Sequence, residues 1–223
     1  MSLLTNIVAY YKLDGNSNDS VGSNNGTSVS VTYSLGNGKI NQGGGFLTIV
    51  PSSIGLPSGT KQSASFTYSF WMNPTTLTPP FSQAYIHSDW SGPGRNFLIL
   101  QNNQNFLINN GNGMSSSDSV STGNIITLGW QHIVFTRNVN VISLYRNGIL
   151  ATSYTSAYSG GATSNLTKIG ADGLATANYG FGGAIDEFGI WSRALNATEV
   201  TSLYNAGLGL SYPFSNSNFF QLF

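Results

Sequence analysis

The chain has 223 residues and no cysteine, and charged residues make up 7% of it, against about a quarter of an ordinary globular domain. Eight basic and eight acidic residues give a formal net charge of zero, which argues against nucleic-acid binding and against attachment to an anionic membrane. Hydrophobic residues reach 40%, yet no apolar run approaches the roughly 20 residues of a transmembrane helix. These values indicate one large domain with its own core, without disulfides or cysteine-based metal sites.

Apolar and polar side chains alternate along much of the chain, which is typical of half-buried strands. The segments with this pattern are 7–13, 27–33, 64–72, 96–101, 130–137 and 141–146. In the third segment every second residue from Phe66 to Met72 is large and apolar, so these side chains share one face. Asn147 and Gly148 predict a type I′ hairpin turn into 149–154, because both tolerate positive φ. Short strands at close intervals predict an all-β, two-sheet antiparallel jelly-roll sandwich.

One short helix is predicted near the C-terminus. Asn196 is a typical N-cap, and Glu199 stands three residues later, as in a capping box. Gly207 favours a left-handed end to the helix. Its narrow apolar stripe, which we expect to dock on the sandwich, consists of Val200, Leu203 and Tyr204.

Several segments, in order, resemble the LamG-like, concanavalin A-like jelly-roll superfamily. AYYKLDGNSNDSVGSNNGT resembles its opening strand and Asp-rich loop, and SFTYSFWMNP resembles a strand ending in a buried Trp. WQHIVFTRNVNVISLYRNG resembles the paired central strands, and FGGAIDEFGIWSRALNATEVTSLYNAG resembles the closing strand and helix. The resemblance implies a LamG-like domain over residues 1–207, with 208–223 as a tail outside the family pattern.

The sequence offers few residues that could catalyse the hydrolysis of a glycosidic bond. Glycoside hydrolysis needs two carboxyl groups about 5–10 Å apart. Glu199 is accounted for as a capping residue, while Asp186 and Glu187 are adjacent in a predicted strand and are expected to point to opposite faces. His132 also lies in a predicted strand, and no nucleophile elbow accompanies it. We therefore expect a protein that is not an enzyme.

Calcium is the cofactor that the sequence favours. The segment DGNSND at residues 14–19 concentrates oxygen ligands of the kind that calcium takes. The resemblance implies a structural calcium between the N-terminal loop and Asp186, with Asp19 and Asn25 on the other side. The alternative is that the loop acids are solvated turn residues that form Asx-turns.

A sugar site is the second hypothesis. Trp90 lies in a loop with Arg95 and Asn96, which combines an aromatic face for a pyranose ring with polar groups for its hydroxyls. Tyr158 and Tyr179 lie in glycine-rich loops and are expected to share the rim of this site. The alternative is that these tyrosines only seal the bases of their loops.

The tail is the last feature. Its free end carries four large apolar side chains, Phe219, Phe220, Leu222 and Phe223. Burying each one is worth about 1.5–3 kcal/mol, so they either fold back on the sandwich or dock on a neighbouring subunit. We favour the neighbour, which predicts a homo-oligomer.

These observations predict a non-catalytic carbohydrate-binding or adhesion module with one structural calcium. We expect it outside the cell or on a virion surface, as a phage head decoration or fibre component. The chain starts without a signal peptide, and a virion protein that is released by lysis needs none. The expected partners are a glycan or cell-surface polysaccharide and a capsid or other virion protein. The alternatives are a capsid decoration protein without glycan binding and, less favoured, a polysaccharide-cleaving enzyme of the same fold.

Overall fold

The computed structural model describes residues 2–48, 52–60, 64–78, 83–89, 96–101, 105–110, 119–156, 167–172 and 179–215. For 83–89, 96–99, 101, 105–110, 119–122 and 124 it describes the backbone alone.

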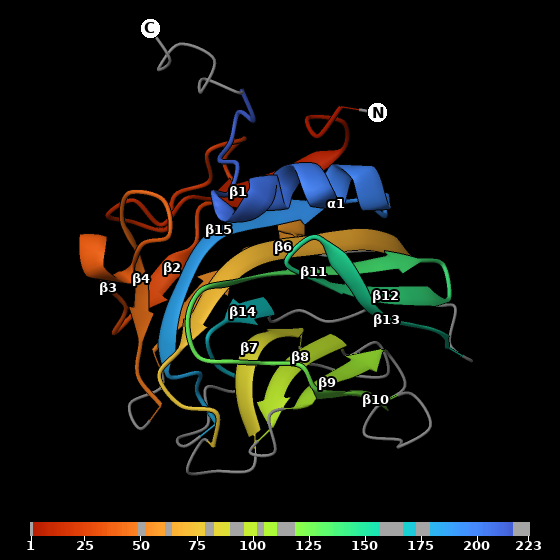
Figure 1. The fold of residues 1–223 in the computed structure, drawn as a ribbon. Coiled ribbons are helices and arrows are strands. Elements are labelled where there is room, and N and C mark those ends of the chain that lie inside the picture. The colour runs from red at the N-terminus through yellow and green to blue at the C-terminus, as the bar shows by residue number, and fades with distance from the viewer. Residues whose placement is uncertain are drawn as a thin grey trace, which may run out of the picture.

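The described residues form two antiparallel sheets that pack face to face (Figure 1). The first sheet has eight strands: β1 (Ile7–Tyr11), β3 (Thr32–Ser34), β4 (Gly43–Phe46), β6 (Ser65–Pro74), β11 (Gln131–Asn138), β12 (Val141–Arg146), β13 (Ile149–Thr155) and β15 (Gly183–Trp191). The second has seven: β2 (Thr27–Val29), β5 (Ser53–Leu56), β7 (Gln83–Asp89), β8 (Asn96–Gln101), β9 (Asn105–Asn110), β10 (Ser119–Asn124) and β14 (Thr167–Ile169). The predicted jelly-roll sandwich is therefore confirmed.

The core lies between the two sheets. Phe66, Tyr68, Phe70 and Met72 of β6 all point into it and are at most 1% exposed, as their alternation predicts. Strands β11, β12 and β15 add their own alternate residues, and β5 and β14 contribute apolar residues from the second sheet. The side chains between these positions point to the outer face of the first sheet.

The helix α1 (Ala197–Tyr204) lies on that outer face, over β15 and β6 (Figure 1). Its Val200 and Leu203 join a second apolar cluster with Tyr10 and Trp191. The capping box is confirmed, since Asn196 Oδ1 accepts the backbone N–H of Glu199 and the Glu199 carboxylate accepts that of Asn196, both at 3.0 Å.

The C-terminal end of α1 differs from the prediction. Asn205, at φ 48°, takes the left-handed capping position, two residues before the predicted Gly207. Asn is the non-glycine residue that enters this conformation most readily, and its amide donates to the carbonyl of Gly209 at 2.9 Å. The short 3₁₀ turn Asn205–Gly207 follows.

The predicted strand 27–33 is two strands. Its first half is β2, which pairs with β5 in the second sheet, and its second half is β3, which pairs with β4 in the first. Ser30 between them has φ 52°, a left-handed conformation that breaks the extended run. The segment therefore crosses from one sheet to the other. Two further 3₁₀ turns occupy Leu35–Asn37 and Ser58–Thr60.

Residues 208–215, here named the strap, run back over the outer face of the first sheet. Tyr212 and Phe214 pack on Tyr10 and Trp191, with the Tyr10 and Phe214 ring centroids 5.3 Å apart. The hydroxyl of Tyr10 donates to the carbonyl of Leu210 at 3.3 Å. The packed unit thus extends past Gly207 to the strap. Phe219, Phe220, Leu222 and Phe223 lie outside the described residues, so their docking on a neighbour stays a prediction.

Candidate functional site

The predicted sugar loop falls largely outside the described residues: Trp90, Arg95 and Tyr158 all do. Asn96 begins β8, where its backbone pairs with Asp89 and Asn110. Tyr179 is 37% exposed and precedes β15. A sugar site around Trp90 therefore stays a prediction.

Asp19 holds its own loop together. Its Oδ1 accepts the backbone N–H groups of Tyr10 at 3.0 Å and Val21 at 2.9 Å. Its Oδ2 accepts those of Gly22 and Asn24, both at 3.1 Å. The amide oxygen of Asn25 accepts the backbone N–H of Asp19 itself at 3.0 Å. This carboxylate is saturated by four donors, and the loop is built around it.

Asp186, in β15, also accepts several backbone N–H groups. Its Oδ2 accepts the backbone N–H groups of Lys39 at 2.8 Å and Ile40 at 2.9 Å, and its Oδ1 accepts that of Glu187 at 2.9 Å. The side chain is fully buried. It ties the loop before β4 to the last strand of the sandwich.

These donor sets do not suit a shared calcium ion. The oxygens of Asp19, Asn25 and Asp186 point at N–H groups, whose positive ends repel a cation, and Asp19 and Asp186 share no hydrogen-bond partner among the described residues. Within the same part of the chain, no three His, Cys, Asp or Glu side chains gather to hold a metal ion. Calcium stays a prediction from the resemblance, and the geometry of these three residues argues against it.

The pair Asp186 and Glu187 departs from the expected alternation. Asp186 pairs with Trp71 and Gly189 pairs with Ser69, so β15 carries one residue more than β6 over this stretch. Glu187 takes φ 53° in this bulge. Both carboxyl groups therefore lie on the outer side of the sheet, and the prediction that they point to opposite faces is wrong.

Burial dominates the electrostatics of the pair. Burial raises the pKa of the Asp186 carboxyl to about 8, although the hydrogen bond from the backbone N–H of Ile40 lowers this pKa. It also raises the pKa of Glu187 to about 7, although the hydroxyls of Tyr10 and Ser211 lie near enough to lower it. Neither hydroxyl makes a hydrogen bond of normal geometry with Glu187, which is 3% exposed beneath the strap. Neither acid is accessible to a polymeric substrate.

His132 lies under α1 as a structural residue. Its Nε2 is 2.9 Å from the hydroxyl of Ser69, and its ring packs against those of Trp71 and Tyr204, which also contact each other. Burial lowers its pKa to about 3, so the ring is neutral near neutral pH. This agrees with its interpretation as a structural polar position rather than a base.

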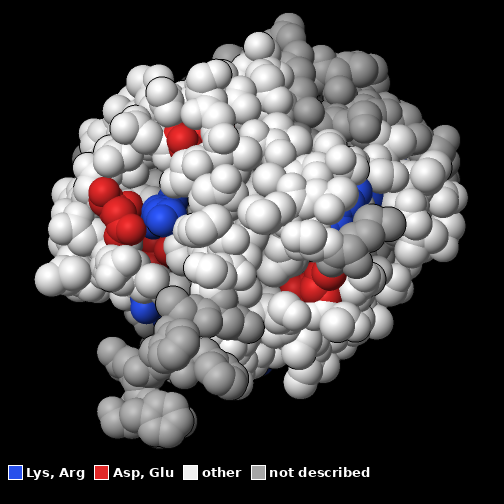
Figure 2. Space-filling view, turned by 90° about the horizontal axis from the view of Figure 1, so that it is seen from above, with Lys and Arg blue, Asp and Glu red and all other residues white. Residues whose placement is uncertain are grey.

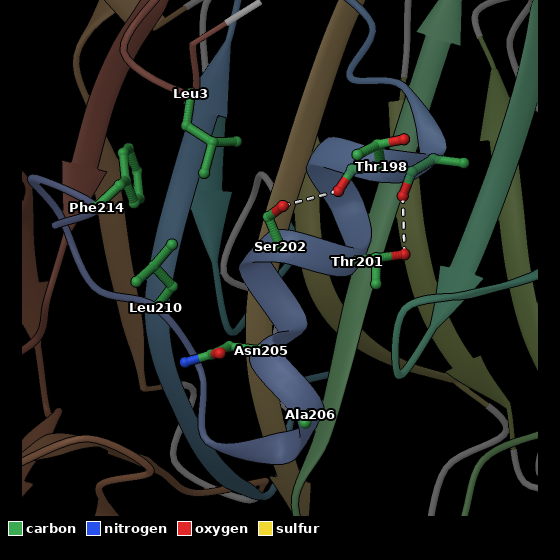
Figure 3. A pocket seen from close by; sticks show the side chains of 9 residues that line it. Leu3, Thr198, Thr201, Ser202, Asn205, Ala206, Leu210 and Phe214 are labelled. Atoms are coloured by element: carbon green, nitrogen blue, oxygen red, sulfur yellow. Dashed lines mark hydrogen bonds between the residues drawn. The ribbon is translucent and has the colours of Figure 1, made fainter. Parts of the chain in front are cut away.

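A hollow on the outer face lies between α1 and the strap (Figure 3). This groove, here named the helix groove, has a volume of about 720 Å³. One wall is apolar and consists of Leu3, Leu210 and Phe214. The opposite wall is the exposed side of α1 and its C-terminal cap, where Ser202 and Asn205 lie on the side of the apolar wall, while the hydroxyl of Thr201 lies on the other side of the helix, 3.3 Å from the carbonyl of Gly148.

The polar wall keeps hydrogen-bonding capacity. The hydroxyls of Thr201 and Ser202 donate to the carbonyls of Ala197 and Thr198, both at 2.9 Å, and their oxygens remain able to accept (Figure 3). Asn205 uses its amide N–H on Gly209, which leaves its carbonyl oxygen without a donor among the described residues. The groove therefore offers acceptors opposite an aromatic ring.

The sequence patterns do not predict this groove. Phe214 falls in the predicted tail 208–223, and the predicted end of the helix is Gly207 rather than Asn205. The dipeptide Tyr212-Pro213 was the available signal, because Pro favours a turn and a turn there returns the chain to the sandwich.

Among the residues that the structure describes, no charged one lines the helix groove. The face seen from above is mostly uncharged, and its acidic and basic side chains form small separate groups (Figure 2). Arg193 and Glu199 pair with each other at 2.7 Å. None of the described helices is long and apolar enough to cross a membrane.

Comparisons with known proteins agree with this architecture. A family model described as the concanavalin A-like lectin/glucanases superfamily matches residues 51–201. No curated protein sequence matches the chain. Among solved structures, domain 4 of AbnA, a GH43 extracellular arabinanase from Geobacillus stearothermophilus in complex with arabinotriose, is 24% identical with a TM-score of 0.72. The match covers 87% of this chain and 96% of that domain.

Two toxin binding domains are also similar in fold. That of Paraclostridial Mosquitocidal Protein 1 is 19% identical with a TM-score of 0.71, and that of botulinum neurotoxin serotype G is 18% identical with a TM-score of 0.66. Each match covers 91% of this chain, but 52% and 51% of the toxin domains. The chain thus spans about half the length of these domains, and the likeness is one of fold.

Proposed function

Because the chain belongs to the concanavalin A-like lectin/glucanase superfamily, we propose that it is a non-catalytic carbohydrate-binding module that takes uncharged sugars in the helix groove. The observation that carries this proposal is the make-up of the groove. An aromatic ring, Phe214, lies across the hollow from the hydroxyl of Ser202 and the amide of Asn205, and the described lining carries no charged residue.

Each wall suits one side of a sugar. The C–H face of a pyranose or furanose ring is apolar and packs on an aromatic ring, while its hydroxyls need hydrogen-bonding groups. Phe214 is held for this by Trp191, whose ring lies 6.0 Å away at 28°. Thr198, Ser202 and Asn205 supply the polar partners from α1. The similar AbnA domain was solved with arabinotriose, a neutral oligosaccharide, which supports the ligand class.

The absence of catalysis is part of the proposal. Hydrolysis needs two carboxyl groups that flank the scissile bond with access to water. Asp186 and Glu187 are 0% and 3% exposed beneath the strap, and Glu199 is tied to Arg193. The described acids therefore do not offer a cleaving pair at the groove.

We also propose that the protein is displayed outside the cell, on the surface of a virion or of a cell. The AbnA domain belongs to an extracellular enzyme, and a face with few charges suits contact with neutral polysaccharide. A capsid partner, a homo-oligomer and a structural calcium remain predictions from the sequence.

The test is an array of neutral and acidic glycans, followed by calorimetric titration with arabinotriose and with each glycan that binds. Ser202→Arg places a long side chain in the groove and keeps helix propensity, and Asn205→Gly removes the amide but keeps the left-handed cap. Each is expected to weaken binding about tenfold or more, as for one or two lost hydrogen bonds. Thr155→Arg adds the same group on the exposed strand β13 as a control.

Silence across the array would overturn the proposed function. Binding that survives Ser202→Arg but is lost in Trp90→Ala would instead place the site in the loop predicted from the sequence. Release of reducing ends from any bound polysaccharide would show an enzyme and refute the non-catalytic part.

A further inference from the structure

A second hollow lies on the same outer face, near the other end of β6 and β15. Its volume is about 360 Å³. The strand register explains its shape. Gly45 of β4 pairs with Thr32 of β3 on one side and with Ala184 of β15 on the other. Ala184 in turn pairs with Asn73 of β6. These four residues form one row across the sheet. We name the hollow above them the trough.

The floor of the trough consists of the two smallest residue types. Neighbouring strands lie about 4.8 Å apart, so Thr32 and Asn73 stand about 14 Å apart with only Gly45 and Ala184 between them. A Cβ at Gly45 would lie 2.4 Å from the amide nitrogen of Asn37 and 2.7 Å from the hydroxyl of Thr32. Glycine is therefore required for the Asn37 side chain to lean over the floor from the 3₁₀ turn.

The walls carry hydrogen-bonding groups that the protein leaves largely unused. The side-chain amide of Asn73 makes no hydrogen bond within the described part of the chain, and that of Asn37 reaches only Thr32, at 3.4 Å. The hydroxyl of Thr75 donates to the carbonyl of Gly182 at 3.0 Å and keeps its acceptor capacity. An amide supplies both a donor and an acceptor, which match two adjacent hydroxyls of a sugar.

Charge and apolar contact narrow the ligand class. No Lys, Arg, Asp or Glu of the described ranges lines the trough, so a charged ligand would lose its water without gaining a partner there. Leu47, which is 57% exposed, lies at one end and offers an apolar surface for the C–H face of a ring. The trough thus suits a neutral polyhydroxylated ring.

We propose that the trough is a second binding site for neutral sugars, distinct from the helix groove. The ligand class rests on the proposed function, whereas the site rests on its own residues. Both hollows open on the outer face of the first sheet, so one neutral polysaccharide surface can engage the two sites. Binding at the second then becomes intramolecular, which raises the avidity for a polymer above the affinity for a short oligosaccharide.

The test follows the side-chain amide signals of Asn73 and Asn37 by nuclear magnetic resonance during titration with arabinotriose and cellotriose. Asn73→Ala assigns the first signal by its loss and is expected to weaken binding at the trough about tenfold. Gly45→Val fills the floor and is expected to abolish it. Asn18→Ala removes an exposed amide elsewhere and serves as the control.

The readouts separate this inference from the proposed function. In Ser202→Arg, whose helix groove is blocked, the Asn73 signal is expected to keep shifting with the wild-type midpoint. If no neutral probe shifts the Asn73 and Asn37 amides while binding at the helix groove persists, the trough is not a site and the proposed function stands. If they shift in the wild-type protein and in Ser202→Arg but not in Gly45→Val, while Ser202→Arg leaves total binding unchanged, the trough stands and the helix groove fails. If neither hollow responds to either probe, both ideas fail.

Discussion

Individual acidic residues hold loops of this protein in place by accepting backbone N–H groups. Asp19 accepts four such groups, and Asp186 accepts three while having no exposure to solvent. A buried donor that loses its acceptor costs about 1–3 kcal/mol. At this position an acid is therefore a structural part of the fold, whether or not any ion is bound nearby.

Asp186→Ala is expected to lower the free energy of unfolding by about 3 kcal/mol, because it leaves Lys39, Ile40 and Glu187 with unpaired N–H groups. Urea denaturation measures the change. Asp186→Asn keeps an acceptor oxygen and is expected to lose less. The same variants test the predicted calcium: a calcium-dependent rise in melting temperature that disappears in Asp186→Asn would support the site, and equal melting temperatures of the wild-type protein in calcium and in EDTA would contradict it.

The buried His132 gives stability a dependence on pH. Its pKa is about 3 in the folded protein and about 6.5 in the unfolded chain, so protonation favours unfolding as the pH falls below about 6.5. From pH 6.5 to 4 the wild-type protein is expected to lose about 2–3 kcal/mol relative to His132→Gln, measured by urea denaturation at each pH. The raised pKa values of Asp186 and Glu187 act in the opposite direction in both proteins and cancel in this difference. Parallel pH profiles for the two proteins would contradict it.

Helix α1 depends on its first turn, because eight residues are too few for a stable isolated helix. Asn196→Ala removes the acceptor for the Glu199 N–H and is expected to cost about 1 kcal/mol. Asn196→Asp keeps an acceptor and is the matched control. Thermal denaturation of the two variants checks this, and equal melting temperatures would show that packing alone fixes the helix.

Elements with a strong local pattern were predictable from the sequence. The alternation in β6, the Asn147-Gly148 turn and the capping box of α1 each depend on residues close together in the chain, so local patterns identify them. The crossing between β2 and β3 depends on one left-handed serine, Ser30, which local patterns do not mark. The bulge at Glu187 is likewise set by the pairing of β15 with β6.

The candidate sites were less predictable than the elements. The helix groove joins Leu3, the face of α1 and Phe214, which meet only after the strap has turned back. The trough is one row across four strands whose residues are scattered from Thr32 to Ala184. Such sites depend on register, and register is fixed by the whole sheet.

The molecule as a whole is closed by its strap. Removing residues 208–223 uncovers Tyr10 and Trp191 and is expected to lower the free energy of unfolding by about 3 kcal/mol, through loss of Tyr212 and Phe214. The chain ending at residue 215 keeps the strap and serves as the matched control. Urea denaturation of both truncated chains measures this.

The same two chains test the predicted oligomer. If Phe219, Phe220, Leu222 and Phe223 dock on a neighbour, the chain ending at residue 215 is expected to elute as a smaller species than the full chain at equal concentration. Equal elution would remove the tail as an oligomer contact, whatever the stability result.

The pairing of β1 with β15 cannot form until nearly the whole chain has been synthesised. Ile7–Tyr11 pairs with Phe188–Trp191, about 180 residues later in the chain. At ordinary rates of synthesis, the interval between the synthesis of the two strands is therefore on the order of 10–40 s. During that time Tyr10 and Tyr11 lack the strand that pairs with them in the native sheet. The nascent chain therefore passes most of its synthesis with its first strand unpaired, and a message cut short before β15 yields a product that cannot close its own sheet.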